Sequence, residues 1–428
     1  MTDPLPWLAP HRDSPFVGEV LVPGSKSLTN RVLILAALGD GPSVITRPLG
    51  SRDTNLMAAA LTTLGATIER DETTWTVTPA TTGATAPVTI DCGLAGTVMR
   101  FVPLLAALGS APVTFDGDEH ARRRPMATTI ASLRALGVAV DDDGRGSLPF
   151  TVHGTGRVDG GEIGIDASAS SQFISALLLV GARFEKGLDL RHTGASVPSM
   201  PHIEMTVAEL RRRGVRIDTP ETGRWIVHPG AVEAVDVEIE PDLSNAGVFV
   251  AGALVTGGSV RIAGWPAETD QAGDAWRTIV PAFGGRVTDD GTDLVFTAGP
   301  TLTGVELDLH DVGELTPVVA AMAALASGPS RLTGVAHLRG HETDRLAALV
   351  AEINRLGGDA EELPDGLLIR PRELHGATFR TYDDHRMAHA AVVLGLRVPG
   401  LLVENVGTTA KTYPDFAPVW ERLMASDA

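Results

Sequence analysis

The sequence repeats itself about every 70 residues, and this repeat strongly limits how the chain can fold. A helix-like segment that ends in glycine and continues into a β-like segment occurs five times. The glycines are Gly65, Gly137, Gly214, Gly284 and Gly357. Glycine in this position suits a left-handed cap at the C-terminus of a helix. The chain is therefore expected to be an array of similar units.

A second sequence pattern alternates with the helix–glycine pattern. Clusters of small and polar residues open segments rich in Ala, Leu and Val, and they begin at Ser25, Gly93, Ser168, Asp242, Val312 and Asp383. Each unit is predicted as a strand, a buried helix, a strand, an amphipathic helix and a β pair, such as residues 66–70 with 74–78. Six such units of about 71 residues each account for the 428 residues, which predicts an α/β (α+β) fold of six βαβαββ repeats.

Six units are too many for one hydrophobic core, so two lobes of three units each are expected. Pro241 and Asp242 mark a break close to the middle of the sequence. Helix N-termini carry free N–H groups and a partial positive charge, and they bind anions. If the repeats are arranged alike, the six polar clusters converge on one cleft.

Positive residues gather at these helix starts, although the whole chain has a net charge of −18. Arginine near a helix N-terminus opposes the macrodipole, so a stabilising role there is poor. The pattern favours a cleft for a substrate with several negative charges. The alternative is that some of these arginines pair with carboxylates across the lobe interface. The seven cations are Lys26, Arg31, Arg100, Arg124, Arg345, Arg386 and Lys411.

Several classes of protein are excluded or disfavoured. The acidic balance argues against a nucleic-acid or anionic-membrane partner, and the single cysteine, Cys92, excludes a disulfide framework or zinc ribbon. The segment 24–27 lacks the glycine of a phosphate loop, and 341–345 is not a zinc-protease motif. The longest apolar runs fall short of the ~18 residues of a membrane span. No targeting segment is visible at the N-terminus, so a cytoplasmic protein is expected. The run Arg211–Arg213 is interpreted as the solvated end of a helix.

The polar clusters carry a family resemblance. Eight segments, in order along nearly the whole chain, resemble those of the 5-enolpyruvylshikimate-3-phosphate synthases (3-phosphoshikimate 1-carboxyvinyltransferases). The segments are Leu21–Arg31, Gly93–Arg100, Arg124–Pro125, Ser170–Phe173, Ser199–Pro201, Glu342–Arg345, Asp384–Met387 and Ala410–Asp415.

The resemblance implies the two-lobed enolpyruvyl transferase fold, with lobes at residues 23–241 and 1–22 plus 242–428 and an active site in the cleft between them. It implies transfer of the enolpyruvyl group of phosphoenolpyruvate to the 5-hydroxyl of shikimate 3-phosphate through a tetrahedral ketal, with release of phosphate. This chemistry requires no metal or organic cofactor. Small anionic substrates are the expected partners, the expected state is a monomer, and the herbicide glyphosate is an expected inhibitor.

The resemblance also implies residue roles. Glu314 matches the catalytic acid, with Lys26 and Glu342 as its partners in proton transfer. The residues that match shikimate 3-phosphate contacts are Lys26, Ser27, Arg31, Ser170, Ser171, Gln172, Ser199, Glu314 and His341. Those that match phosphoenolpyruvate contacts are Lys26, Gly96, Arg124, Gln172, Arg345, Arg386 and Lys411. A structural hydrogen bond is the alternative interpretation for each.

The sequence departs from the family pattern at five positions: Leu94, Phe101, His202, Glu314 and His341. Glu314 stands where aspartate is more common, so the backbone must absorb one extra methylene. His341 replaces a lysine, which makes any substrate contact there sensitive to pH. Two alternatives stay open. One is the sister enzyme that acts on UDP-N-acetylglucosamine, which usually has asparagine where Ser27 stands and a reactive cysteine in a loop. The other is a non-catalytic anion-binding relative.

Overall fold

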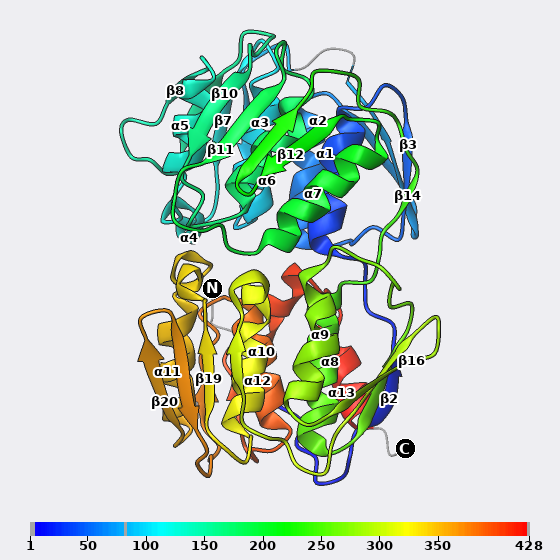
Figure 1. Ribbon diagram of the computed structural model, residues 1–428, viewed down its shortest axis with the longest axis vertical. Coiled ribbons are helices and arrows are strands. Elements are labelled where there is room, and N and C mark those ends of the chain that lie inside the picture. The colour runs from blue at the N-terminus through cyan, green and yellow to red at the C-terminus, as the bar shows by residue number, and fades with distance from the viewer. Residues whose placement is uncertain (1–4, 81–83, 426–428) are drawn as a thin grey trace. The chain divides into compact units, whose positions relative to one another are not determined.

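The computed structural model describes residues 5–80 and 84–425 (Figure 1). Part of the predicted segment 1–22 therefore lies outside the described residues. The chain divides into two compact units: Gly24–Ile239, which we call the continuous unit, and Met1–Pro23 with Glu240–Ala428, which we call the discontinuous unit. No helix among the described residues is long and apolar enough to cross a membrane.

The continuous unit contains three repeats, and each places its hairpin beside a parallel pair of strands. The strand orders are β14-β3-β5-β4, β6-β7-β9-β8 and β10-β11-β13-β12. The elements are α1 (Lys26–Ala37), β3 (Ser43–Thr46), α2 (Arg52–Thr63), β4 (Thr67–Arg70), β5 (Thr74–Thr78), β6 (Val88–Asp91), α3 (Gly96–Ala106), β7 (Pro112–Asp116), α4 (Glu119–Arg122), α5 (Ala127–Ala135), β8 (Ala139–Asp141), β9 (Phe150–His153), β10 (Gly161–Ile165), α6 (Gln172–Gly181), β11 (Leu188–His192), α7 (Met200–Arg212), β12 (Ile217–Glu221), β13 (Arg224–Val227) and β14 (Val237–Glu238).

The discontinuous unit has the sheets β16-β17-β15-β2, β18-β19-β21-β20 and the three-stranded β1-β23-β22. Its elements are β1 (Trp7–Leu8), β2 (Val17–Val20), α8 (Leu243–Thr256), β15 (Ser259–Ile262), η1 (Ala272–Ala275), α9 (Trp276–Ala282), β16 (Arg286–Asp289), β17 (Leu294–Thr297), β18 (Glu306–Asp308), η2 (His310–Leu315), α10 (Thr316–Ala324), β19 (Ser330–Thr333), η3 (Ala336–Gly340), α11 (Arg345–Arg355), β20 (Asp359–Leu363), β21 (Gly366–Arg370), β22 (Thr378–Phe379), α12 (His385–Gly395), β23 (Leu402–Val403), η4 (Val406–Lys411) and α13 (Phe416–Ala425).

Two repeats take one strand from a distant part of the sequence, because the chain crosses from one unit to the other before β3 and again before β15. β14, at the end of the continuous unit, pairs in parallel with β3 near its beginning. β2, from the N-terminal segment, pairs in parallel with β15 of the discontinuous unit. The sixth repeat differs from the other five. Its described residues end in α13 instead of a hairpin, and β1 completes its sheet.

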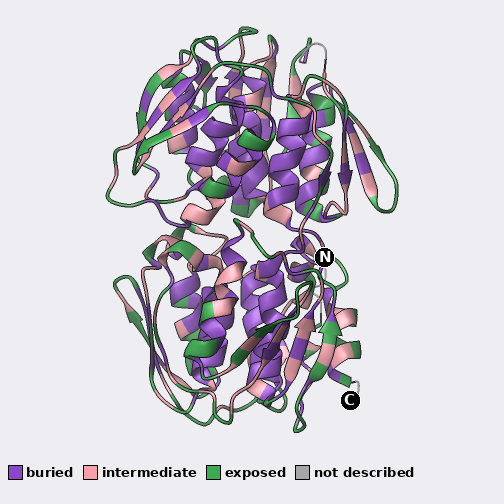
Figure 2. Cartoon of the chain, turned by 45° about the vertical axis from the view of Figure 1, so that its right-hand side comes forward, coloured by how far each residue is buried: buried purple, intermediate pink, exposed green. Residues whose placement is uncertain are grey.

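Three helices form the centre of each unit. α1, α3 and α6 contact one another in the continuous unit, and α8, α10 and α12 do so in the discontinuous unit. They are buried along most of their length, as Figure 2 shows. Because all faces of these helices are covered, their sequences are mostly apolar beyond the first one or two turns. Cys92 is fully buried in the core of the continuous unit, as expected.

The five repeat glycines adopt the predicted conformation. Each lies two residues beyond the end of a helix, with φ between 72° for Gly214 and 104° for Gly65. Residues with a Cβ rarely adopt this backbone conformation, which explains why glycine recurs there. The prediction of a glycine-capped helix in each of these repeats is confirmed.

Candidate active site

The polar clusters open the six buried helices, as predicted. These helices begin at Lys26, Gly96, Gln172, Leu243, Thr316 and His385. Three of them have side-chain caps: Ser25 accepts from the N–H of Leu28, Asp242 from Asn245 and Asp384 from Arg386. The remaining N–H groups of the first turns are available to anions.

One group of predicted residues meets where α3 and α6 begin. A Cβ on Gly96 would lie 3.1 Å from two guanidinium nitrogens of Arg124 and 3.2 Å from Oε1 of Gln172. Arg124 is buried and donates to the carbonyl of Leu94 at 3.3 Å. Arg100 donates to Oε1 of Gln172 at 2.7 Å. Arg124, Gln172 and the N-terminus of α3 thus surround Gly96, and Arg100 bonds the same glutamine, an arrangement suited to a phosphate or carboxylate.

Lys26 occupies the first position of α1 and points its ammonium group toward a buried carboxylate. Its Nζ lies 3.5 Å from Oδ2 of Asp53, whose side chain is 3% exposed. Asp53 lies in the first turn of α2, where a carboxylate complements the helix dipole. The same carboxylate holds the lysine near the N-terminus of α1.

Arg31 was predicted as a substrate contact, but the structure places it mainly among protein oxygens. It is 2% exposed and donates to the carbonyls of Ser27 and His202 and to the hydroxyls of Ser175 and Thr206. Four of its five N–H donors are thereby used. Burial lowers the pKa of Arg31 to about 10, and the charge of Glu209 opposes that shift.

The predicted serines lie at the starts of α6 and α7. Ser170 accepts from the N–H of Gln172 at 3.3 Å, and Ser171 is buried as the cap residue of α6. Ser199 precedes α7 with φ 56° and ψ 50°, a left-handed conformation that is uncommon for serine. Its carbonyl accepts from the N–H of His202. Strained backbone of this kind is often found at ligand sites.

In the discontinuous unit, Glu342 is the centre of a network of positive groups. Its Oε1 accepts from Nζ of Lys411 at 2.6 Å, and its Oε2 lies 3.2 Å from both Arg345 and His385. Burial by itself would raise the pKa of this carboxyl. Lys411, His385 and Arg345 outweigh that effect and hold the pKa of Glu342 well below its usual value. Glu342 is therefore ionised at neutral pH.

Arg345 connects Glu342 to the start of α12. It forms a bidentate ion pair with the fully buried Asp384, at 2.8 and 3.1 Å, and a 3.3 Å hydrogen bond with Nδ1 of His341. Because a guanidinium only donates, Nδ1 of His341 accepts in this contact. Burial lowers the pKa of Arg345, but the charges of Asp384 and Glu342 reverse the effect and raise it above the usual value.

Glu314 lies in η2, two residues before α10 begins at Thr316. Its Oε1 accepts from the hydroxyl of Ser244 at 3.4 Å. Arg386 donates to the carbonyl of the same serine at 3.0 Å, and burial lowers its pKa. Glu314 and Arg386 are thus brought together at the start of α8.

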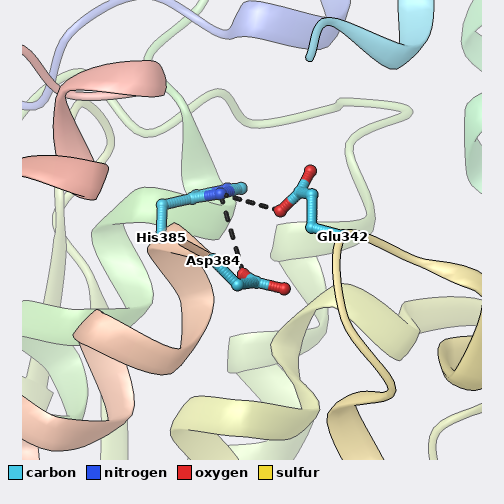
Figure 3. A group of neighbouring side chains, drawn as sticks. All are labelled: Glu342, Asp384 and His385. Carbon is cyan, nitrogen blue, oxygen red and sulfur yellow. Dashed lines mark ion pairs between the residues drawn. The ribbon is translucent and has the colours of Figure 1, made fainter. Parts of the chain in front are cut away.

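Glu342, Asp384 and His385 could also suggest a metal site, because their ligand atoms lie within 4.8 Å of one another (Figure 3). Their oxygens, however, already accept from Lys411 and Arg345. A divalent cation there would be repelled by both. The donor set fits an ion-pair network better than a metal centre.

The sequence reasoning did not single out every residue of these networks. Asp384 and His385 lay inside a matched segment but received no role. Asp53 had no signal of its own, because an acid in the first turn of a helix is explained by the dipole. Ser175 lies in the apolar helix α6 and Thr206 in the amphipathic helix α7, and only the packing of these two helices against Arg31 shows that both residues bond it.

His337 provides a test of how acid affects this unit. Burial, with His310 nearby, lowers its pKa from 6.5 to about 4. At pH values between about 4 and 6.5, His337 therefore binds a proton in the unfolded chain but not in the folded protein. The free energy of unfolding should fall as the pH drops from 7 to 4.5. We expect His337 to account for about 2.5 kcal/mol of that loss. Urea unfolding of the wild type and H337N at both pH values measures it. An equal loss in both proteins would contradict the assignment.

Comparison with known proteins identifies the family. Residues 10–420 match the family model of EPSP synthase (3-phosphoshikimate 1-carboxyvinyltransferase). The chain belongs to the EPSP synthase family. It is 56% identical to the 3-phosphoshikimate 1-carboxyvinyltransferase of Kocuria rhizophila, over 98% of this chain and 97% of the relative.

Solved structures of EPSP synthase from Acinetobacter baumannii share the fold. Two of them superpose with TM-scores of 0.80 and 0.78, each at 23% identity and covering 97% of both chains. The predicted fold class, that of the enolpyruvyl transferases, is thereby confirmed.

Proposed function

We propose that this chain transfers the enolpyruvyl group of phosphoenolpyruvate to the 5-hydroxyl of shikimate 3-phosphate and releases phosphate. The observation that carries the proposal is the family match over residues 10–420 together with the 56% identical relative of that name. The buried ionic networks described above supply the fixed positive charge and the ionised carboxylates that such a reaction needs.

In the continuous unit, Lys26, Ser27, Ser170, Ser171, Gln172 and Ser199 bind shikimate 3-phosphate, and Gly96, Arg124 and Gln172 bind phosphoenolpyruvate. The cluster around Gly96 supports the second assignment, because Arg124 and the N-terminus of α3 converge there. Bidentate guanidinium groups match the geometry of phosphate and carboxylate.

In the discontinuous unit, Glu314 accepts the proton of the attacking 5-hydroxyl, and Glu342 moves the proton at C3 of the enolpyruvyl group. The low pKa of Glu342 keeps its carboxylate ionised, and only the ionised form can accept the C3 proton in the elimination step. Lys411, Arg345 and Arg386 hold phosphoenolpyruvate, and His341 contacts the shikimate ring.

Lys26, the other proton-transfer partner, gives a proton to C3 and makes C2 of phosphoenolpyruvate electrophilic. The 5-hydroxyl oxygen adds there to form a tetrahedral ketal, and its proton passes to Glu314. Loss of a C3 proton and of phosphate then restores the double bond on the shikimate oxygen. Lys26, which the buried Asp53 holds in place, is positioned to stabilise the charge that develops on the leaving phosphate.

The deciding experiment follows phosphate release from phosphoenolpyruvate with shikimate 3-phosphate in one reaction and UDP-N-acetylglucosamine in another. Release that depends on shikimate 3-phosphate supports the proposal. Release with the nucleotide sugar alone would assign the chain to the sister enzyme. No release in either reaction, from folded protein that still binds shikimate 3-phosphate, would favour the non-catalytic relative. A monomeric state and a cytoplasmic location stay predictions.

Glyphosate inhibition tests the space beside Gly96. The methyl group of G96A would lie 3.1 to 3.2 Å from Arg124 and Gln172, closer than an ordinary contact. We expect the inhibition constant of glyphosate to rise at least about tenfold more than KM for phosphoenolpyruvate, because steric overlap costs most for the bulkier ligand. Parallel titrations of wild type and G96A measure both constants. Equal changes in the two would refute the steric argument.

A further inference from the structure

Helix α7 carries a polar stripe on a buried face. His202, Thr206, Glu209 and Arg213 follow at intervals of four, three and four residues, which places them on one side of the helix and its C-terminal cap. Thr206, Glu209 and Arg213 are 0 to 3% exposed. The expectation that the run Arg211–Arg213 is solvated is wrong for Arg213, whose side chain turns inward from the helix end.

The N-terminal part of this stripe, His202 and Thr206, contacts Arg31. The guanidinium of Arg31 donates to Oγ1 of Thr206 at 2.7 Å and to the carbonyl of His202 at 2.9 Å. It also donates to the hydroxyl of Ser175 on α6 and to the carbonyl of Ser27 on α1. One buried cation therefore joins the first two turns of α1, α6 and α7, and all four of its partners are neutral oxygens.

The C-terminal part of the stripe contains a second buried cation, Arg213. None of the three guanidinium nitrogens of Arg213 has a hydrogen-bond partner among the described residues. Glu209, one turn away, is the acid whose charge reaches both Arg31 and Arg213. From the exposed side, Nε of Arg212 lies 3.2 Å from its Oε1. The buried carboxylate of Glu209 therefore lies on the same face of α7 as Thr206, which Arg31 contacts, and as the buried Arg213, one turn from each.

We propose that Glu209 is a positioning residue for shikimate 3-phosphate, acting through Arg31. Its charge keeps the Arg31 guanidinium seated, and Arg31 in turn fixes the helix starts that carry Ser27, Gln172 and Ser199. This inference rests on the proposed function of those residues. Glu209 lies ten residues along α7 from Ser199, about 15 Å at 1.5 Å per residue, so it acts without touching the substrate.

The physical reason is the cost of an uncompensated charge in a buried setting. Without Glu209, neutral oxygens alone must stabilise a guanidinium that has lost its hydration, and burial already lowers the pKa of Arg31. The guanidinium then gains by moving toward water and releases the carbonyls of Ser27 and His202. The helix starts are then less ordered in the free protein. The free energy needed to order them when the substrate binds weakens its affinity.

The test is E209Q, which keeps the shape of the side chain and removes its charge. We expect KM for shikimate 3-phosphate to rise about tenfold, the equivalent of one weakened charge-assisted contact, with KM for phosphoenolpyruvate changed less than about twofold. The matched control is E352Q. Glu352 is fully buried in the discontinuous unit, where it accepts from Arg355 and Tyr382. The E352Q substitution should lower thermal stability and leave both KM values unchanged.

A second variant guards against poor folding. E209Q/R213M removes one buried anion and one buried cation together, so the stripe keeps the net charge of the wild type. We expect it to be more stable than E209Q and still to show the raised KM, whereas R213M alone keeps the wild-type KM. A normal KM in either protein that lacks Glu209 would overturn the proposal. Wild-type protein that neither binds nor turns over shikimate 3-phosphate would instead overturn the proposed function.

Discussion

The substitution E314Q should reduce kcat by about two to four orders of magnitude, the range expected for loss of a general base. The amide cannot accept the proton of the attacking hydroxyl, but it keeps the size of the side chain and one acceptor oxygen for Ser244. Affinity for shikimate 3-phosphate should therefore change less than about tenfold. Phosphate release measures the first quantity and titration calorimetry the second.

The matched control for this experiment is D311N, which neutralises an exposed acid on the same short helix, η2. It should leave kcat within about twofold of the wild type, since surface charges act weakly on the site. If E314Q retained wild-type turnover, Glu314 would be a substrate contact at most, and the search for the base would turn to Glu342. A binder without activity would show no difference between the two variants.

The substitution D384A should have the largest effect on stability. It leaves Arg345, 2% exposed, without its bidentate partner and removes the cap of α12. Breaking a buried ion pair on one side costs about 3–5 kcal/mol, and loss of a cap adds about 1 kcal/mol. Urea unfolding at pH 7.5 should show this loss, together with a higher KM for phosphoenolpyruvate.

An exposed ion pair provides the comparison. Asp359 bonds Arg370 and Arg372 at the surface of the same unit, and D359A should cost no more than about 1 kcal/mol. Similar losses for D384A and D359A would mean that the buried network around Arg345 contributes no more than a surface pair. KM for phosphoenolpyruvate should be unchanged in D359A.

The amino-acid sequence by itself determined the repeat and most of the local structure. Glycines such as Gly65 and Gly214 end helices because few other residues adopt their backbone conformation, so they can be read without a structure. The apolar runs that follow the polar clusters predict buried helices for the same kind of reason, since their period and composition are local properties. The resemblance then named the residues that we propose contact the substrates.

Tertiary structure decided which of those residues have other partners. Arg31 and Arg345 were predicted alike as substrate contacts, yet most of their donors bond Thr206, His202, Asp384 and other protein groups. Asp53, Glu209 and Arg213 carried no sequence signal because their partners are distant in the chain or defined by packing. Burial and neighbouring groups determine what a charged residue interacts with. Both depend on how helices such as α1, α6 and α7 pack, which the sequence does not show directly.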